Sequence, residues 1–327
     1  MWHDCSADDA DDADDGRVKM VSRCRCVMTK CSKMCRLCLL ANLILLLVNV
    51  SLLLLQFDTN PMLDFFVEDR VTASERRLML YTFDTLASAL DKANVTYFMY
   101  GGTLIGSIRH HAHIPWDDDL DIIIAYSDRP KAESAMLGLS PEFVFYKPAD
   151  SQKKILQWKF YSASASSTAW IPKPYGWPFV DIFFYRDNST HIWDIEPEYH
   201  NAGFVWPKNV IFPLTRRPFG STLAPAPCDS LAFVETNYPG AGSTRCAAPN
   251  FNHRRDIHRL SLRSGKTVPC ASLWNMFPFV FRSRSADDTV IESLRIGNWT
   301  LQTLHVPCVV CNGNDSAGDD RIVNLWY

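Results

Sequence analysis

The sequence predicts an α/β (α+β) fold, with a mixed sheet, flanking helices and a loop-rich C-terminal half. Two observations lead to this class. Short β-rich runs alternate with segments of helical periodicity, as in layered α/β domains. Glycine and proline are frequent at residues 213–249, where they favour turns. With 327 residues, the chain is long enough for one large domain or two small ones.

The first element of the folded part is expected to be an amphipathic helix at residues 74–94. Its apolar side chains Leu78, Tyr81, Leu86 and Leu90 lie near one face of such a helix. The pattern therefore indicates a helix that is buried along one side.

A glycine pair interrupts the next apolar run. Residues 96–100 are a strand candidate, Gly101 and Gly102 break it, and residues 103–110 are expected to form a helix behind the break. Because glycine has no Cβ, the backbone amides of this pair can approach a phosphate closely. Thr103 adds a hydroxyl, and the helix adds the positive end of its dipole. Gly101, Gly102 and Thr103 are therefore candidates for phosphate or nucleotide binding.

Four further runs are expected to be strands of the same sheet. They are rich in β-branched and aromatic residues and are short enough for strands. They lie at residues 120–125, 143–146, 155–161 and 179–185.

Three aspartates in these runs form a candidate metal site. Strand alternation places Asp119 and Asp121 on one face. Asp181 is the single charge of its apolar run, and a buried carboxylate is costly unless it is paired or ligated. If the two runs are neighbouring strands, the three carboxylates converge. Oxygen ligands of this kind favour Mg²⁺ or Mn²⁺, so we predict that these residues are both metal ligands and catalytic.

The remaining acidic residues of this segment are expected to support the site. Only alternate residues of the strand share its face, so we expect Asp117 and Asp118 to form the turn before the strand or to hold the ligands in place. An EF-hand is excluded, because its loop requires glycine where Ile122 stands.

Basic and aromatic residues before the aspartates carry two interpretations each. His110, His111 and His113 are expected to be a solvated helix end rather than zinc ligands. Arg109 is a candidate for phosphate binding, with pairing to an aspartate as an equal alternative. Trp116 is a candidate for stacking on a base, with packing in the core as the alternative.

The N-terminal part predicts a membrane anchor. Residues 37–55 contain no charge over 19 positions, enough for a single transmembrane helix and longer than a usual signal peptide core. Basic residues precede this span, within a disordered tail at residues 1–36, and indicate a type II orientation with the N-terminus in the cytosol. A stem at residues 56–73, a catalytic domain at residues 74–256 and a C-terminal extension at residues 257–327 would then lie in the Golgi or ER lumen.

Three further features bear on compartment and partners. Asn94, Asn188, Asn298 and Asn314 each begin an Asn-x-Ser/Thr sequon, which supports a secretory lumen and N-glycosylation. The five cysteines of that part allow at most two disulfides. The net charge is −3, so the chain has no electrostatic reason to bind nucleic acid.

The segment GGTLIGSIRHHAHIPWDDDLDI, residues 101–122, resembles the hallmark of the LicD family, which includes fukutin and the fukutin-related protein. VDIFFY, residues 180–185, resembles the family's third-carboxylate strand. Residues 212–240 resemble its proline-rich tail, although Pro239 stands inside the family's Tyr-Gly pair. The resemblance covers about residues 74–256.

This resemblance implies a nucleotidyltransferase-like fold and a metal-dependent phosphotransferase. Such an enzyme moves phosphocholine or ribitol phosphate from a CDP-linked donor to a glycan hydroxyl and releases CMP. Asp119, Asp121 and Asp181 would hold one or two Mg²⁺ or Mn²⁺ ions, and Asp181 would also take the acceptor proton. Arg109 would stabilise charge on the transferred group. The alternatives are a Golgi glycosyltransferase with an Asp-x-Asp metal site and a non-catalytic scaffold glycoprotein.

Overall fold

The computed structural model describes nine parts of the chain. These are residue 36 and residues 39–51, 71–148, 156–166, 172–240, 244–249, 251–258, 267–285 and 289–307. The chain separates into two compact units, Met1–Pro61 and Met62–Tyr327. Most of the predicted tail, the stem up to residue 70, Asn314, Cys308 and Cys311 lie outside the described residues.

The first unit contains one described helical segment. Residues 39–51 are helical, whereas the rest of the predicted span at residues 37–55 lies outside the described residues. Among the helices of the described ranges, none combines the length and the apolar character needed to cross a membrane.

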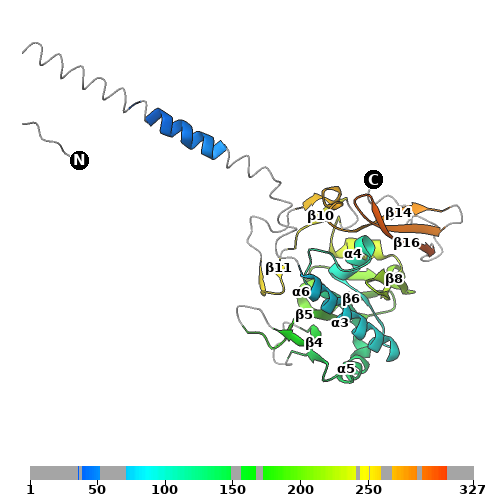
Figure 1. The fold of residues 1–327 in the computed structure, drawn as a ribbon. Coiled ribbons are helices and arrows are strands. Elements are labelled where there is room, and N and C mark those ends of the chain that lie inside the picture. The colour runs from blue at the N-terminus through cyan, green and yellow to red at the C-terminus, as the bar shows by residue number, and fades with distance from the viewer. Residues whose placement is uncertain are drawn as a thin grey trace, which may run out of the picture. The chain divides into compact units, whose positions relative to one another are not determined.

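A seven-stranded mixed sheet forms the centre of the second unit (Figure 1). Its order is β1-β2-β5-β4-β3, and β6 and β7 extend from β5. β2 and β5 are parallel, and the other pairs are antiparallel. The strands are β1 (Tyr97–Met99), β2 (Leu120–Ala125), β3 (Phe143–Tyr146), β4 (Trp158–Ser166), β5 (Trp177–Asp187), β6 (His191–Asp194) and β7 (Val205–Pro207). The predicted α/β class and all five predicted strands are therefore confirmed.

Helix α3 (Ala73–Lys92) packs against β4 and β5. Thr72 and Glu75 form a capping box, in which the Thr72 hydroxyl accepts from the Glu75 amide and the Glu75 carboxylate accepts from the Thr72 amide. The buried face runs through Met79, Phe83, Leu86, Ala87 and Leu90. Tyr81, which we expected on that face, is exposed and donates to Glu142 instead.

Helix α4 (Gly101–His110) begins directly at the glycine pair, two residues earlier than predicted. Gly101 takes a left-handed backbone angle, φ +50°, at the turn from β1 into the helix. This angle favours glycine, so the pair forms the first turn of the helix instead of a separate break. The helix packs against β2 and α8 (Ser230–Asn237).

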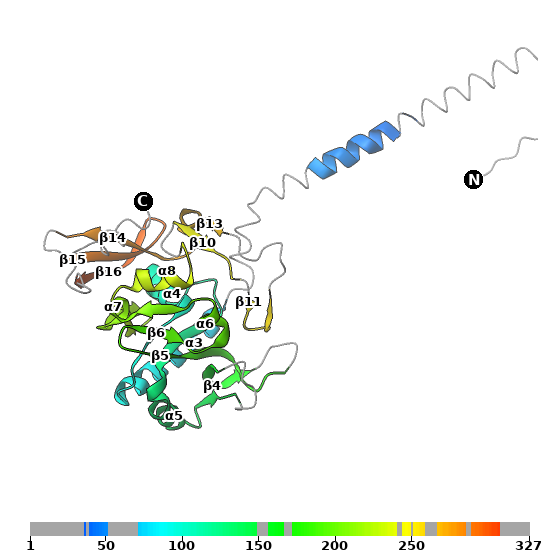
Figure 2. The ribbon, with the colours of Figure 1, turned by 180° about the vertical axis from the view of Figure 1, so that it is seen from behind.

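The C-terminal half is more regular than predicted, because it contains small sheets as well as loops (Figure 2). A disulfide between Cys246 and Cys270 joins the β10–β13 pair, within the expected limit of two disulfides among the five cysteines. The further elements are α5 (Arg129–Leu137), α6 (Pro197–Asn201), α7 (Lys208–Ile211), β8 (Thr215–Phe219), β9 (Thr222–Ala226), β10 (Arg245–Ala247), β11 (Phe251–Asn252), β12 (Ile257–His258), β13 (Thr267–Pro269), β14 (Phe279–Arg284), β15 (Thr289–Ile296) and β16 (Trp299–Pro307), with short 3-10 helices at Tyr126–Asp128 and Cys270–Leu273.

A buried charge cluster attaches the β14–β15–β16 sheet to α4 and β8. The Glu292 carboxylate on β15 accepts from Arg282 Nε at 2.9 Å and from Arg217 Nη2 at 3.0 Å. It also lies 2.6 Å from His111 Nε2, just after α4. Arg282 Nη2 donates to the carbonyl oxygen of Ile108. The cluster thus fixes this sheet over the end of α4.

The histidines at this end of α4 are buried, contrary to our prediction of a solvated helix end. His110, His111 and His113 are each no more than 3% exposed. The ring of His110 packs against Phe279 of β14, and His111 contacts Glu292 of β15. Burial lowers the pKa of His110 and of His113 to about 3, so both rings are neutral. Among the described residues, the groups suited to a metal ion do not include them.

Candidate metal and phosphate site

Three carboxylates meet where β2 and β5 begin to pair. Asp119 precedes β2, Asp121 is its second residue, and the parallel register places Asp121 opposite Asp181 on β5. One ligand oxygen from each of Asp119, Asp121 and Asp181 lies within 4.8 Å of the others. The expectation that neighbouring strands bring these residues together is therefore correct.

Burial and mutual repulsion perturb this cluster. Burial, followed by the charges of Asp119 and Asp181, raises the pKa of Asp121 well above its usual range. Burial is also the main cause that raises the pKa of Asp119 to about 6, although His253 opposes it. The pKa of Asp117 is raised for the same reason, with Asp119 and Asp118 adding to the effect. Crowded oxygen donors with excess negative charge fit a hard divalent cation such as Mg²⁺ or Mn²⁺.

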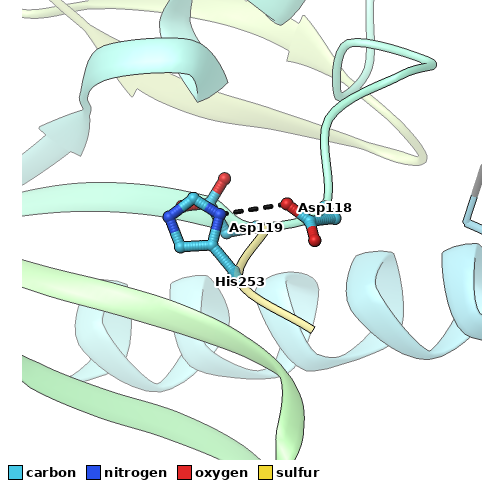
Figure 3. A group of neighbouring side chains, drawn as sticks. All are labelled: Asp118, Asp119 and His253. Carbon is cyan, nitrogen blue, oxygen red and sulfur yellow. Dashed lines mark hydrogen bonds and ion pairs between the residues drawn. The ribbon is translucent and has the colours of Figure 1, made fainter. Parts of the chain in front are cut away.

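Two side chains of the protein itself bring positive charge to the cluster. Lys159 Nζ on β4 lies 2.5 Å from Asp181 Oδ1. His253, in the β11–β12 turn, contacts Asp118 Oδ1 with Nδ1 at 3.0 Å (Figure 3). Its Nε2 lies 3.0 Å from Asp119 Oδ2. Burial opposes a charged imidazole, but the attraction of Asp119 and Asp118 outweighs it and raises the pKa of His253 to about 10. Ligand atoms of Asp118, Asp119 and His253 also lie within 4.8 Å of one another.

The loop that carries His253 is fixed over the carboxylates. The amide of Arg254 donates to Asp118 Oδ2 at 3.1 Å, and its guanidinium pairs with Glu75 at 2.6 Å. The indole of Trp177 donates to the carbonyl oxygen of Asp118. Asp118 therefore holds this loop in place, as expected of a residue that supports the ligands.

Lys159 and His253 were not predicted as site residues, for different reasons. Lys159 is the single charge of the predicted strand at residues 155–161, the same signal that selected Asp181, and could have been found. His253 follows Asp119 by more than a hundred residues, and no motif surrounds it.

The glycine pair lies at the carboxylate cluster, as predicted, and the structure adds a second reason for glycine. A Cβ on Gly101 would stand 2.9 Å from Asp121 Oδ2, and one on Gly102 would stand 2.7 Å from Asp117 Oδ2. The hydroxyl of Thr103 accepts the amide of Asp121 at 2.6 Å, so it fixes the start of β2 against α4. The pair is thus required for the close approach of carboxylates, and it places the N-terminus of α4 beside them.

Tyr238 lies close to Gly101, at the start of α4. Its hydroxyl oxygen would be 3.3 Å from a Cβ on Gly101, whereas its side chain is 45% exposed. The residue belongs to the proline-rich tail noted in the sequence, but the pattern alone assigned it no role.

Arg109 and Trp116 contact another part of the molecule. Arg109 Nη2 donates to the carbonyl oxygen of Arg245 at 3.3 Å, and its Nη1 lies 3.9 Å from Cys246 Sγ. The indole of Trp116 donates to the carbonyl oxygen of Ala247 at 3.0 Å. Both side chains are buried. These contacts pack both side chains against β10, which is the packing alternative that the sequence left open for Trp116. Phosphate or nucleotide binding by Arg109 and Trp116 stays a prediction.

Three of the four sequon asparagines are on the surface. Asn94, Asn188 and Asn298 are exposed, and Asn298 lies in the turn between β15 and β16. Modification of these residues stays a prediction.

The family model described as LicD/FKTN/FKRP, nucleotidyltransferase domain, matches residues 94–229. This chain carries a LicD-family domain. Asp119, Asp121 and Asp181 all lie inside the matched residues, whereas His253 lies outside them.

Curated relatives of this chain include proteins named as transferases. The chain is 27% identical over 166 residues to the ribitol 5-phosphate transferase FKRP of Homo sapiens, which is 50% of this chain and 32% of the relative. It is 41% identical over 54 residues to the lipopolysaccharide cholinephosphotransferase LicD of Haemophilus influenzae, which is 16% of this chain and 20% of the relative. An uncharacterized protein of Rickettsia typhi is 27% identical over 151 residues, 46% of this chain and 42% of that protein. The chain thus spans less than half the length of these relatives.

Proposed function

We propose that this chain is a metal-dependent phosphotransferase that moves a phospho-alcohol group, of the phosphocholine or ribitol phosphate kind, from a CDP-linked donor to a glycan hydroxyl. The observation that carries the proposal is the convergence of Asp119, Asp121 and Asp181 within 4.8 Å inside a LicD-family domain. The names of the FKRP and LicD relatives add support for this class of transfer.

The residues of the cluster fit the metal that this chemistry uses. Asp119, Asp121 and Asp181 would hold Mg²⁺ or Mn²⁺, because all three offer hard oxygen ligands. Such an ion neutralises a diphosphate and orients an in-line displacement. The N-terminus of α4, opened by Gly101 and Gly102, offers backbone amides to phosphate oxygens. Asp181 would accept the proton of the acceptor hydroxyl.

We further propose the membrane setting that the sequence predicts: a single span at residues 37–55, type II orientation, a Golgi or ER location, and a luminal catalytic domain within residues 74–256. Nine large apolar side chains between Leu39 and Val50 are 46–67% exposed in the first unit. An apolar helix surface of this kind requires a cover, which a bilayer supplies. N-glycosylation at the exposed asparagines would follow from a luminal location.

The test is Mn²⁺-dependent release of CMP by the full chain from CDP-choline, CDP-ribitol and CDP-glycerol, with Asp119→Ala as the inactive variant. We expect release from one donor and its loss in the variant. Hydrolysis of a UDP-sugar instead would favour a glycosyltransferase. CDP binding without release from any donor would favour a scaffold protein, and either result would refute the proposal.

A further inference from the structure

Lys159 lies beside the carboxylate cluster, and the proposed function gives it no role. In the antiparallel register of β4 and β5, Lys159 lies opposite Asp181, and in the parallel register of β2 and β5, Asp181 lies opposite Asp121. Asp121, Asp181 and Lys159 therefore form one row across three adjacent strands. The row places an ammonium group beside the predicted metal ligands.

The surroundings of Lys159 hold its ammonium group at this position. The side chain is 9% exposed. Nζ lies 3.7 Å from the ring centroid of Phe179 and 5.0 Å from that of Tyr175. Cation–π contacts of this kind orient an ammonium group without using its N–H donors. Among the described residues, Asp181 Oδ1 is the hydrogen-bond acceptor of Lys159 Nζ. An ammonium group has three N–H donors, so this bond uses one of the three.

Stability alone does not explain a lysine at this position. A buried ion pair gains little over apolar residues of similar size, because both charges must lose their hydration. The pair with Asp181 uses one of the three N–H donors of Lys159. A second anion at the remaining donors would add a charge-assisted hydrogen bond that the pair with Asp181 alone does not supply.

The chemistry of the donor supplies that anion. A diphosphate held at Asp119, Asp121 and Asp181 brings negative charge to a cluster that is already acidic. Arg109, the guanidinium that the sequence suggested for the phosphate, contacts β10 instead. Among the described residues, Lys159 is the ammonium group that contacts the carboxylate cluster, and its pair with Asp181 uses one of its three donors.

We propose that Lys159 binds a phosphate oxygen of the donor while it keeps its ion pair with Asp181. It is thus a donor-binding residue, and the inference rests on the proposed function. Lys159 would bridge Asp181 and the phosphate, whereas Asp119, Asp121 and Asp181 would hold the divalent cation. Loss of Lys159 should therefore weaken phosphate binding and spare metal binding.

The test measures the two ligands separately on the full chain by calorimetry: Mn²⁺ alone, then CDP or inorganic pyrophosphate at saturating Mn²⁺. In Lys159→Met we expect Mn²⁺ affinity equal to or above that of the wild type. We expect affinity for both phosphate compounds to fall by about 10- to 100-fold, the range for a hydrogen bond to a charged group. Lys147→Met is the matched control, because Lys147 pairs with Glu133 on the surface, and neither affinity should change.

Several outcomes overturn the assignment of Lys159. Unchanged phosphate affinity in Lys159→Met does so, and so does an Mn²⁺ affinity that falls by the same factor, since the lysine then only organises Asp181. A wild type that binds neither phosphate compound also overturns it. A wild type that binds pyrophosphate but not CDP refutes the CDP-linked donor and leaves Lys159 to be judged on pyrophosphate.

A measurement on the wild type covers the case in which Lys159→Met does not fold. Acetylation of Lys159 is followed by mass spectrometry in the presence of Mn²⁺, with and without pyrophosphate. We expect pyrophosphate to protect Lys159 and to leave the acetylation of Lys147 unchanged. Equal acetylation of Lys159 in both conditions refutes the contact.

Discussion

Neutralising Glu292 is expected to destabilise the second unit strongly. Its carboxylate is 2% exposed and contacts Arg282, Arg217 and His111. Glu292→Gln keeps the size of the side chain but leaves the guanidinium of Arg282, which is fully buried, without its counter-charge. Breaking one partner of a buried pair costs about 3–5 kcal/mol. That is a large part of a total stability of about 5–15 kcal/mol.

The assay is urea unfolding followed by tryptophan fluorescence, with thermal unfolding as a second measurement. At about 2–4 °C per kcal/mol for a domain of this size, the midpoint should fall by about 6–20 °C. Glu133→Gln is the control, because Glu133 pairs with Lys147 at 3.2 Å on the surface, where a pair contributes about 0–1 kcal/mol. A Glu292→Gln variant within about 1 kcal/mol of the wild type would show that the cluster does not stabilise the fold.

Glu292 also makes the free energy of unfolding depend on pH, in a direction that follows from its pKa. Burial opposes the charged form of Glu292, but Arg217 and Arg282 outweigh it and hold its pKa well below the usual 4.5. The native state therefore binds this proton less tightly than the unfolded chain. The stabilisation is fully present above pH 4.5 and is lost as the pH falls through the native pKa. Glu292→Gln should remove this part of the acid destabilisation.

Three further changes test the site and its support. Asp121→Asn should weaken Mn²⁺ binding by about 100-fold or more in calorimetry, with an unchanged far-ultraviolet circular dichroism spectrum; equal affinity would exclude Asp121 as a ligand. Gly101→Ala should abolish CMP release, because its Cβ would stand 2.9 Å from Asp121 Oδ2 at φ +50°, whereas Gly138→Ala, whose nearest contact is 3.4 Å, should be as active as the wild type. Cys246→Ser opens a loop of sequence separation 24 and should cost about 3 kcal/mol in urea unfolding; a loss below about 1 kcal/mol would contradict this.

The part of the site that could be predicted depends on local rules. Asp119 and Asp121 follow from strand alternation, and Asp181 follows from the cost of a lone charge in an apolar strand. Their convergence needed one further condition, that β2 and β5 be neighbours, and the structure meets it. The central strands were predictable for the same reason, because short β-rich runs mark them.

The remainder depends on contacts between distant segments, which no local pattern encodes. His111 is buried because Glu292 lies 181 residues later and covers it. Arg109 contacts β10 for a similar reason, at a separation of 136 residues from Arg245. The regular sheet at β14–β15–β16 also lay beyond the segment in which the family resemblance gave expectations.

The position of the β11–β12 turn has a consequence for how this site can vary between related chains. His253 and Arg254 touch Asp118, Asp119 and Glu75, although only the first two of these partners fall within the matched stretch at residues 94–229. The segments that flank the family domain therefore meet over its carboxylates. Substitutions in either flank would therefore be expected to change the strength of the proposed cation binding while every aspartate is kept. A fragment trimmed to the matched limits would lose these contacts.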